Sequence, residues 1–90
     1  MLTYALIGTN QQKLDHVVTS IKEIAGQNIN KLFTVYGEYD LVLKLKSKHS
    51  EEARETLQQI KDLNGVISMQ SGVVVHQTHS KDTKPNIESL

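Results

Sequence analysis

The chain has 90 residues, no cysteine, and ten basic residues balanced by ten acidic ones, so its formal net charge is zero. A chain of this length makes one domain, with no room for a second core. The balanced charge and single arginine, Arg54, argue against a nucleic-acid surface, because phosphate binding requires clustered lysine and arginine. The lack of cysteine excludes disulfides and thiolate metal sites, and no apolar run approaches the ~20 residues of a membrane-spanning helix. We therefore expect a cytoplasmic domain that binds neither nucleic acid nor membrane directly.

The first third of the chain predicts a strand and a helix. Residues 2–7 form a short apolar run that stops at Gly8 and is typical of a strand. Thr9 or Asn10 can cap a helix that runs to Ala25, where Gly26 supplies the left-handed residue that ends it. The inward helix face follows the i, i+3, i+4, i+7 spacing: Leu14, Val17, Val18, Ile21 and Ile24.

The centre of the chain predicts a β-hairpin. Two β-prone runs, residues 31–36 and 41–46, flank the short link Gly-Glu-Tyr-Asp. Glycine adopts positive φ without steric cost, and aspartate can bond nearby backbone amides, so this link is a turn signal. In the second run Leu41, Leu43 and Leu45 alternate with Val42 and Lys44, so we expect one strongly apolar face and one mixed face.

The last part of the chain predicts a second helix and a fourth strand. A cap within residues 47–50 precedes two glutamates that favour the first helical turn, and Asn64-Gly65 ends the helix. Its inward residues are Ala53, Leu57 and Ile60. Residues 66–76 form the strand, in which Gly72 marks a bulge or the close approach of another backbone or a ligand. Residues 77–90 are polar, and we expect a disordered tail there.

The order β-α-β-β-α-β predicts a ferredoxin-like α+β domain over residues 1–76, with a four-stranded antiparallel sheet and two helices on one face. The other sheet face carries too many apolar residues to remain in water. We therefore expect two copies to pair sheet to sheet in a twofold dimeric α+β barrel. A chain this short also gains stability from association.

The element order and two motifs resemble the effector-binding domain of the Lrp/AsnC regulators, also called the regulation of amino-acid metabolism (RAM) domain. One motif is Asn64-Gly65-Val66, and the other is the hairpin Val35-Tyr36-Gly37-Glu38-Tyr39-Asp40-Leu41-Val42-Leu43-Lys44-Leu45. The resemblance implies a homodimer that assembles further, often into a ring of dimers, with an amino acid as small-molecule effector between neighbouring dimers. Full-length members carry an N-terminal helix-turn-helix. This chain is similar to a stand-alone version that would act through a partner, such as a full-length regulator.

The resemblance also implies a ligand site at the hairpin and the last strand. Its residues are Tyr36, Gly37, Glu38, Tyr39, Asp40, Ser68, Gln70 and Ser71. The family's Thr-x-Thr maps onto Met69 and Ser71, of which only Ser71 keeps a hydroxyl. Asp40 would hold the ligand ammonium, and the amides after Gly37 would take its carboxylate. From the spacing of the residues alone, we would expect Asp40 only to cap its own turn and Gly37 only to supply the required φ, whereas the resemblance favours the ligand role. The two tyrosines could line the pocket or pack between dimers, and we favour the interface.

No pattern indicates an enzyme, a cofactor or a metal site. His16 and His49 lie near different helices, and His76 and His79 have no carboxylate spaced to complete a metal site. The serines lack the context of a catalytic nucleophile. Two alternatives stay open. One is a small dimeric α+β-barrel enzyme, whose sign would be a buried acid or base in the intra-dimer cavity. The other is a structural assembly module that binds nothing.

Overall fold

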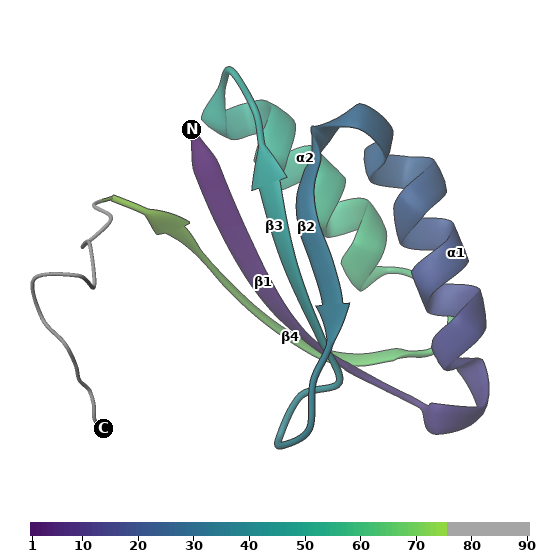
Figure 1. Ribbon diagram of the computed structural model, residues 1–90. Coiled ribbons are helices and arrows are strands. Elements are labelled where there is room, and N and C mark those ends of the chain that lie inside the picture. Colours follow the sequence, from purple (N-terminus) through teal and green to yellow (C-terminus); the bar gives the residue numbers. More distant parts are fainter. Residues whose placement is uncertain (76–90) are drawn as a thin grey trace, which may run out of the picture.

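The computed structural model of the chain describes residues 1–75. Figure 1 shows four strands in one sheet with both α-helices on the same side of it. The elements in chain order are β1 (Leu2–Thr9), the 3₁₀ turn η1 (Gln11–Lys13), α1 (Leu14–Ala25), the 3₁₀ turn η2 (Gly26–Asn28), β2 (Ile29–Thr34), β3 (Leu41–Lys46), α2 (Ser50–Lys61) and β4 (Val66–Val74). This arrangement confirms the predicted ferredoxin-like α+β fold. None of the helices in residues 1–75 is long and apolar enough to cross a membrane.

The sheet has the order β2-β3-β1-β4, and each neighbouring pair is antiparallel. The register places Leu43 of β3 between Ala5 of β1 and Leu32 of β2. Residues directly opposite in a sheet share a face, so these three side chains point toward the helices. The central pair β1 and β3 is therefore the part of the sheet that the helices cover best.

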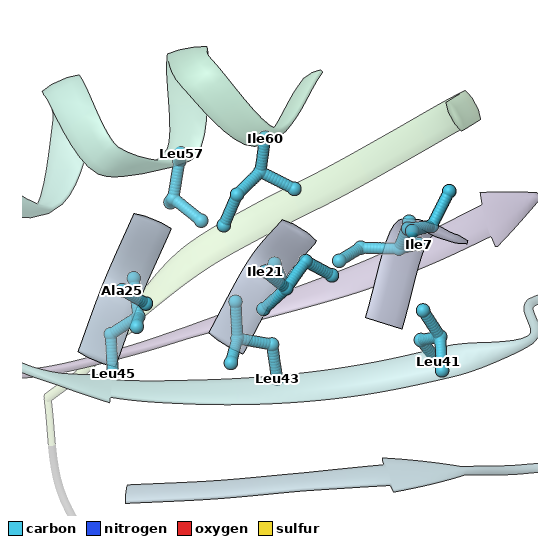
Figure 2. Close-up of a cluster of buried hydrophobic side chains, with 10 residues drawn as sticks. Ile7, Ile21, Ala25, Leu41, Leu43, Leu45, Leu57 and Ile60 are labelled. Carbon is cyan, nitrogen blue, oxygen red and sulfur yellow. The ribbon is translucent and has the colours of Figure 1, made fainter. Parts of the chain in front are cut away.

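The core lies between the helices and the sheet, and Figure 2 shows side chains from α1, α2 and the strands meeting there. The helix residues Val17, Ile21 and Ala25 are four apart and form the buried stripe of α1. The predicted inward residues of α2 are also confirmed as buried: Ala53, Leu57 and Ile60. Burying a leucine or isoleucine side chain stabilises the fold by roughly 1.5–3 kcal/mol, so this cluster is the main source of stability.

The first strand and helix join differently from the prediction. β1 continues through Gly8 to Thr9, because Gly8 pairs with Ser68 of β4. A Cβ atom on Gly8 would lie 2.5 Å from the Ser68 Oγ, so a larger residue here would require the exposed Ser68 side chain to turn away. Asn10 is the cap, with its Oδ1 accepting the Gln12 amide at 3.0 Å, but it opens the 3₁₀ turn η1 before α1 begins.

β2 is displaced by two residues from its predicted range of 31–36. Ile29 pairs with Leu45 and packs against the core, so burial draws the start of the strand toward α1. The strand ends at Thr34, which leaves Val35 and Tyr36 in the loop before β3. The predicted boundaries of this strand were therefore wrong at both ends, whereas those of β3 are confirmed.

The predicted cap of α2 is correct in position but not in chemistry. His49 is the capping residue, and its side chain makes no capping bond. Instead the Glu52 carboxylate accepts the Lys48 amide at 3.3 Å and so satisfies one of the amides that precede the helix.

The side of the sheet away from the helices, called the open face below, is uncovered within residues 1–75 (Figure 1). It carries alternate residues of each strand: Leu2, Tyr4, Leu6, Gly8, Lys31, Phe33, Val42, Lys44, Lys46, Ser68, Gln70, Gly72 and Val74. The Tyr4 ring lies over Gly72, where a Cβ would stand 2.8 Å from the ring. The close approach predicted at Gly72 is thus made by an aromatic side chain, and the sheet irregularity of β4 lies elsewhere, opposite Gly8 and Thr9. β4 ends at Val74, and the predicted tail lies outside the described residues.

Candidate functional site

The β2–β3 loop, residues 35–40, projects beyond one end of the sheet (Figure 1). The Val35 amide donates to the Asp40 carbonyl at 2.9 Å and closes the loop, and the Asp40 amide donates to the Ile7 carbonyl at 2.9 Å. Gly37 has φ of 141°, a conformation that other residues rarely adopt, although a Cβ there would meet no atom within 4 Å. Glycine at this position is therefore needed for backbone conformation and not for space.

The Asp40 carboxylate joins this loop to the start of the first helical segment. Its Oδ2 accepts the Thr9 amide at 2.7 Å and the Thr9 hydroxyl at 3.3 Å, and its Oδ1 accepts Nε2 of Gln11 at 2.7 Å. Within residues 1–75 these bonds all lead out of the loop, so the alternative in which Asp40 caps its own turn is wrong. An ionised carboxylate offers about four lone-pair sites, so these bonds leave one free on Oδ1.

A cavity of about 330 Å³ lies between the loop and the start of α1. This volume falls at the lower end of the range of small-molecule pockets, roughly 300–1,000 Å³. The cavity is lined by Gln11, Leu14, Thr34, Val35, Tyr36, Gly37 and Asp40. The lining residues thus combine one carboxylate, one side-chain amide and two hydroxyls with apolar groups, which suits a small molecule carrying a positive group and an apolar part.

The sequence pattern did not identify Gln11 and Leu14 as residues of this cavity. Gln11 precedes Asp40 by 29 positions and reaches it only because β1 and β3 are paired in the sheet. A polar side chain immediately after the Asn10 cap is also a common way to begin a helix, so the local pattern carries no sign of a ligand role.

The predicted site residues of the loop do not all face the cavity. Tyr36, Gly37 and Asp40 line it, whereas Glu38 is exposed on the loop. The Tyr39 hydroxyl donates to Oε1 of Gln70 at 2.9 Å, which ties the loop to β4. The Tyr36 side chain is fully exposed, whereas that of Tyr39 is bonded to Gln70, so Tyr36 is the aromatic group of the loop that is available to contact another molecule at the cavity.

The predicted residues of β4 are divided between the two sides of the sheet. Ser68 and Gln70 pair with Gly8 and Leu6 and belong to the open face. Ser71 pairs with Ala5 and lies on the helix side, where it lines a second cavity of about 190 Å³ beside Thr3 and Arg54. Neither the open-face pair nor Ser71 lines the loop cavity of the same chain.

The other candidate chemistry of the chain is dispersed. Residues 1–75 contain no group of three histidine, aspartate or glutamate side chains close enough to hold a metal ion. His16 and His49 are exposed, the first on α1 and the second before α2. His76 and His79 lie outside the described residues.

The family model described as the Lrp/AsnC ligand binding domain matches residues 3–84. The HTH-type transcriptional regulator FL11 of Pyrococcus abyssi is 29% identical over 84 residues, which are 93% of this chain and 54% of that protein. The chain therefore spans about half the length of this curated relative.

Two solved structures illustrate the likeness of fold. A protein from Thermus thermophilus gives a TM-score of 0.75 at 23% identity, covering 87% of this chain and 96% of that one. A feast or famine regulatory protein from M. tuberculosis, solved in complex with L-methionine, gives a TM-score of 0.68 at 17% identity, covering 91% and 54% respectively. At these identities the structural matches establish the fold.

Proposed function

The chain belongs to the Lrp/AsnC ligand-binding domain family, and on that premise we propose that it is an amino-acid-sensing and oligomerisation domain. The observation that carries the proposal is the 330 Å³ cavity beside the Asp40 carboxylate. The domain would regulate transcription or metabolism through a protein partner, because its balanced charge argues against direct binding to nucleic acid. A full-length regulator with the same domain is the partner we expect, and the cytoplasm is where such regulators act.

The cavity offers a place for each part of a zwitterion. The free lone pair on Asp40 Oδ1 can accept one ammonium proton in a charge-assisted hydrogen bond. Within residues 1–75 the loop amides that donate to other backbone groups are those of Val35 and Asp40. Of the other four, the amides of Tyr36 and Gly37 belong to residues that line the cavity and would take the ligand carboxylate. The ligand side chain would then lie against Leu14 and Val35.

The oligomerisation that we propose begins with a dimer in which two copies of the chain pair through their open faces. Phe33 is 45% exposed there, and Leu6 and Val42 are half-buried beside it, so an apolar layer is left without cover. A second copy with the same face would supply that cover in a twofold arrangement. Tyr36 would contact a neighbouring dimer, since its side chain projects from the loop into solvent.

Because Ser68, Gln70 and Ser71 do not line the cavity of their own chain, they can belong to the ligand site only through a neighbouring copy. A ligand that contacts two copies binds the assembled state more tightly than the separate one. It therefore shifts the population toward assembly, which is the sensing mechanism we propose.

A structural assembly module without a ligand is the second candidate. The observation that favours it is that three hydrogen bonds already occupy Asp40 and fix the loop. The family of regulatory domains favours either of these functions over an enzyme. The two candidates differ in whether any small molecule stabilises the protein.

The test is thermal unfolding and light scattering of the full chain with each of the twenty L-amino acids. A ligand present at 100 times its Kd stabilises the folded state by about 2.7 kcal/mol, which is readily measured. We expect one or a few amino acids to raise the unfolding temperature and change the assembly mass. If none has an effect, the structural module replaces the sensor.

Asp40→Asn is the sharpest variant for this site. An asparagine can still accept the Thr9 amide through its carbonyl oxygen, so this bond of the loop remains, while the negative charge and the Oδ1 acceptor beside Gln11 are lost. We expect loss of the amino-acid response with little change in the unliganded unfolding temperature. Asp15→Asn, which removes an exposed carboxylate from the first turn of α1, is the control and should respond as the wild type. An unchanged affinity in Asp40→Asn would remove Asp40 from the site.

A further inference from the structure

We propose that Gln11 is a specificity-determining residue of the loop cavity, supplying the second acceptor for the ligand ammonium beside Asp40. This inference rests on the proposed function and defines its ligand class as primary α-ammonium zwitterions with a neutral, apolar side chain. Neither the hairpin motif nor the strand pattern assigns a role to Gln11. It belongs to the cavity because its side chain bonds to Asp40.

The geometry of the Gln11 amide supports this role. Its Nε2 donates to Asp40 Oδ1 at 2.7 Å, and the side chain lines the cavity. The carboxamide is planar and carries its acceptor Oε1 beside its donor, so the bond to Asp40 also fixes the position of Oε1. Within residues 1–75 no donor reaches that oxygen. An acceptor is therefore held next to the carboxylate with its hydrogen-bonding capacity unused.

Counting hydrogen bonds shows why the ammonium needs this second acceptor. A ligand ammonium carries three N–H donors. Asp40 Oδ2 already accepts hydrogen bonds from the amide and the hydroxyl of Thr9, and Oδ1 already accepts one from Gln11 Nε2. Asp40 can therefore accept only one further hydrogen bond. Oε1 of Gln11 can receive the second. An uncharged hydroxyl in place of the ammonium has a single donor and can use only one of the two acceptors.

The backbone holds Gln11 at a fixed position. It is the first residue of η1, and Asn10 closes that turn through its side chain to the Gln12 amide at 3.0 Å and its carbonyl to the Lys13 amide at 2.8 Å. The acceptor is thus attached to a capped turn and not to a free loop. A ligand held by Asp40 and Gln11 would join the β2–β3 loop to the start of α1.

The remaining lining restricts the ligand side chain. Leu14 and Val35 are apolar, and no lysine or arginine is among the cavity residues. An acidic side chain would meet the Asp40 carboxylate without a compensating cation, so it is disfavoured. The apolar wall therefore favours leucine or methionine over aspartate or glutamate.

The experiment compares Gln11→Met with the matched control Gln12→Met in the full chain. Methionine approximates the volume of glutamine and removes both hydrogen-bonding groups, and Gln12 is an exposed neighbour whose side chain does not line the cavity. Calorimetry or NMR titration uses L-leucine, L-methionine, L-aspartate and the 2-hydroxy acid analogue of leucine. We expect Gln11→Met to lower the affinity for L-leucine and L-methionine about tenfold, equivalent to about 1.4 kcal/mol of binding free energy. The affinity for the hydroxy acid should change much less, so the variant should discriminate less between the amino acid and the hydroxy acid.

The outcomes separate this inference from the function on which it rests. If wild type binds amino acids and Asp40→Asn abolishes binding, but Gln11→Met matches Gln12→Met, the sensor stands and the role of Gln11 is refuted. If Gln11→Met lowers the affinity for the amino acid and for the hydroxy acid equally, Gln11 only supports the loop and its role in specificity is refuted. If no amino acid binds wild type, both proposals fall together. Preferential binding of L-aspartate would overturn the assigned ligand class alone.

Discussion

The two faces of the sheet are made by the same strands, yet only one of them is complete in the described chain. On the helix side, Leu41, Leu43 and Leu45 of β3 are at most 1% exposed because α1 and α2 cover them. On the open face, Phe33 of β2 is 45% exposed although it pairs with Val42, the immediate neighbour of those leucines. Alternation alone therefore does not determine burial: a face of the sheet is buried only where a second layer covers it.

The open face also differs from the helix side in charge. Lys31 and Lys44 lie directly opposite each other on it, and like charges in that position are unfavourable. Their aliphatic stems can still lie along apolar neighbours while the ammonium groups stay in water. A sheet-to-sheet dimer would therefore have a dry part around Leu6 and Val42 and a basic, wetter margin.

The largest effect on stability is expected from a substitution in the core on the helix side of the sheet. Leu43→Ala removes a fully buried side chain from the centre of the core and should lower the free energy of unfolding by about 2–5 kcal/mol. Urea unfolding followed by circular dichroism measures this loss. Val42→Ala, one residue away on the open face, is the control and should cost clearly less at concentrations where the chain is monomeric. Equal losses would mean that the two faces are equally buried in solution.

The next effect tests whether a second copy covers the open face. Leu6→Glu places a carboxylate in the middle of that face and removes an apolar burial of roughly 1.5–3 kcal/mol per chain from any dimer. We expect light scattering to show a monomer where wild type gives a dimer or larger assembly, with the circular dichroism spectrum preserved. Thr19→Glu on the exposed side of α1 should leave the mass unchanged. A Leu6→Glu variant that keeps the wild-type mass would move the interface elsewhere.

A smaller effect is expected where the open face is already packed within one chain. Gly72→Ala puts a methyl group 2.8 Å from the Tyr4 ring, so the ring must move, at a cost of about 1–3 kcal/mol. The double variant with Tyr4→Ala should lose less than the sum of the two single changes, since the clash is then absent. Chemical denaturation of the four proteins gives the coupling. Additive losses would show that Tyr4 does not lie over Gly72 in solution.

The features of the fold that depend on local spacing could be predicted from the sequence. Val17 and Ile21 of α1 and the alternating leucines of β3 follow directly from periods of 3.6 and 2 residues. The other predicted inward residues of α1 are only partly buried, and the buried Ala25 was not predicted. The limits of β2 could not, because Ile29 joins the strand through its contacts with the core, which no local pattern records.

The candidate site was predicted in part for the same reason. Tyr36, Gly37 and Asp40 belong to a contiguous turn motif, so the sequence pointed to them. Gln11 enters the cavity through the pairing of distant strands, and Ser71 faces the helices because of its register with Ala5. Register fixes which residues of different strands share a face, and it is a property of the folded sheet.

The smallest expected effect concerns the link between the loop and the open face. Tyr39→Phe removes the hydroxyl that donates to Gln70 at 2.9 Å, a bond worth at most about 0.5–1.5 kcal/mol and less where water competes. Tyr36→Phe in the same loop is the matched control, because that side chain is fully exposed and should give no measurable change in stability. Urea unfolding at low protein concentration compares the two variants as monomers. If the dimer buries Gln70, the Tyr39→Phe loss should grow at high concentration, since Gln70 Oε1 then loses its partner away from water. A loss that does not depend on concentration would show that Gln70 stays hydrated and lies at the margin of the open-face contact.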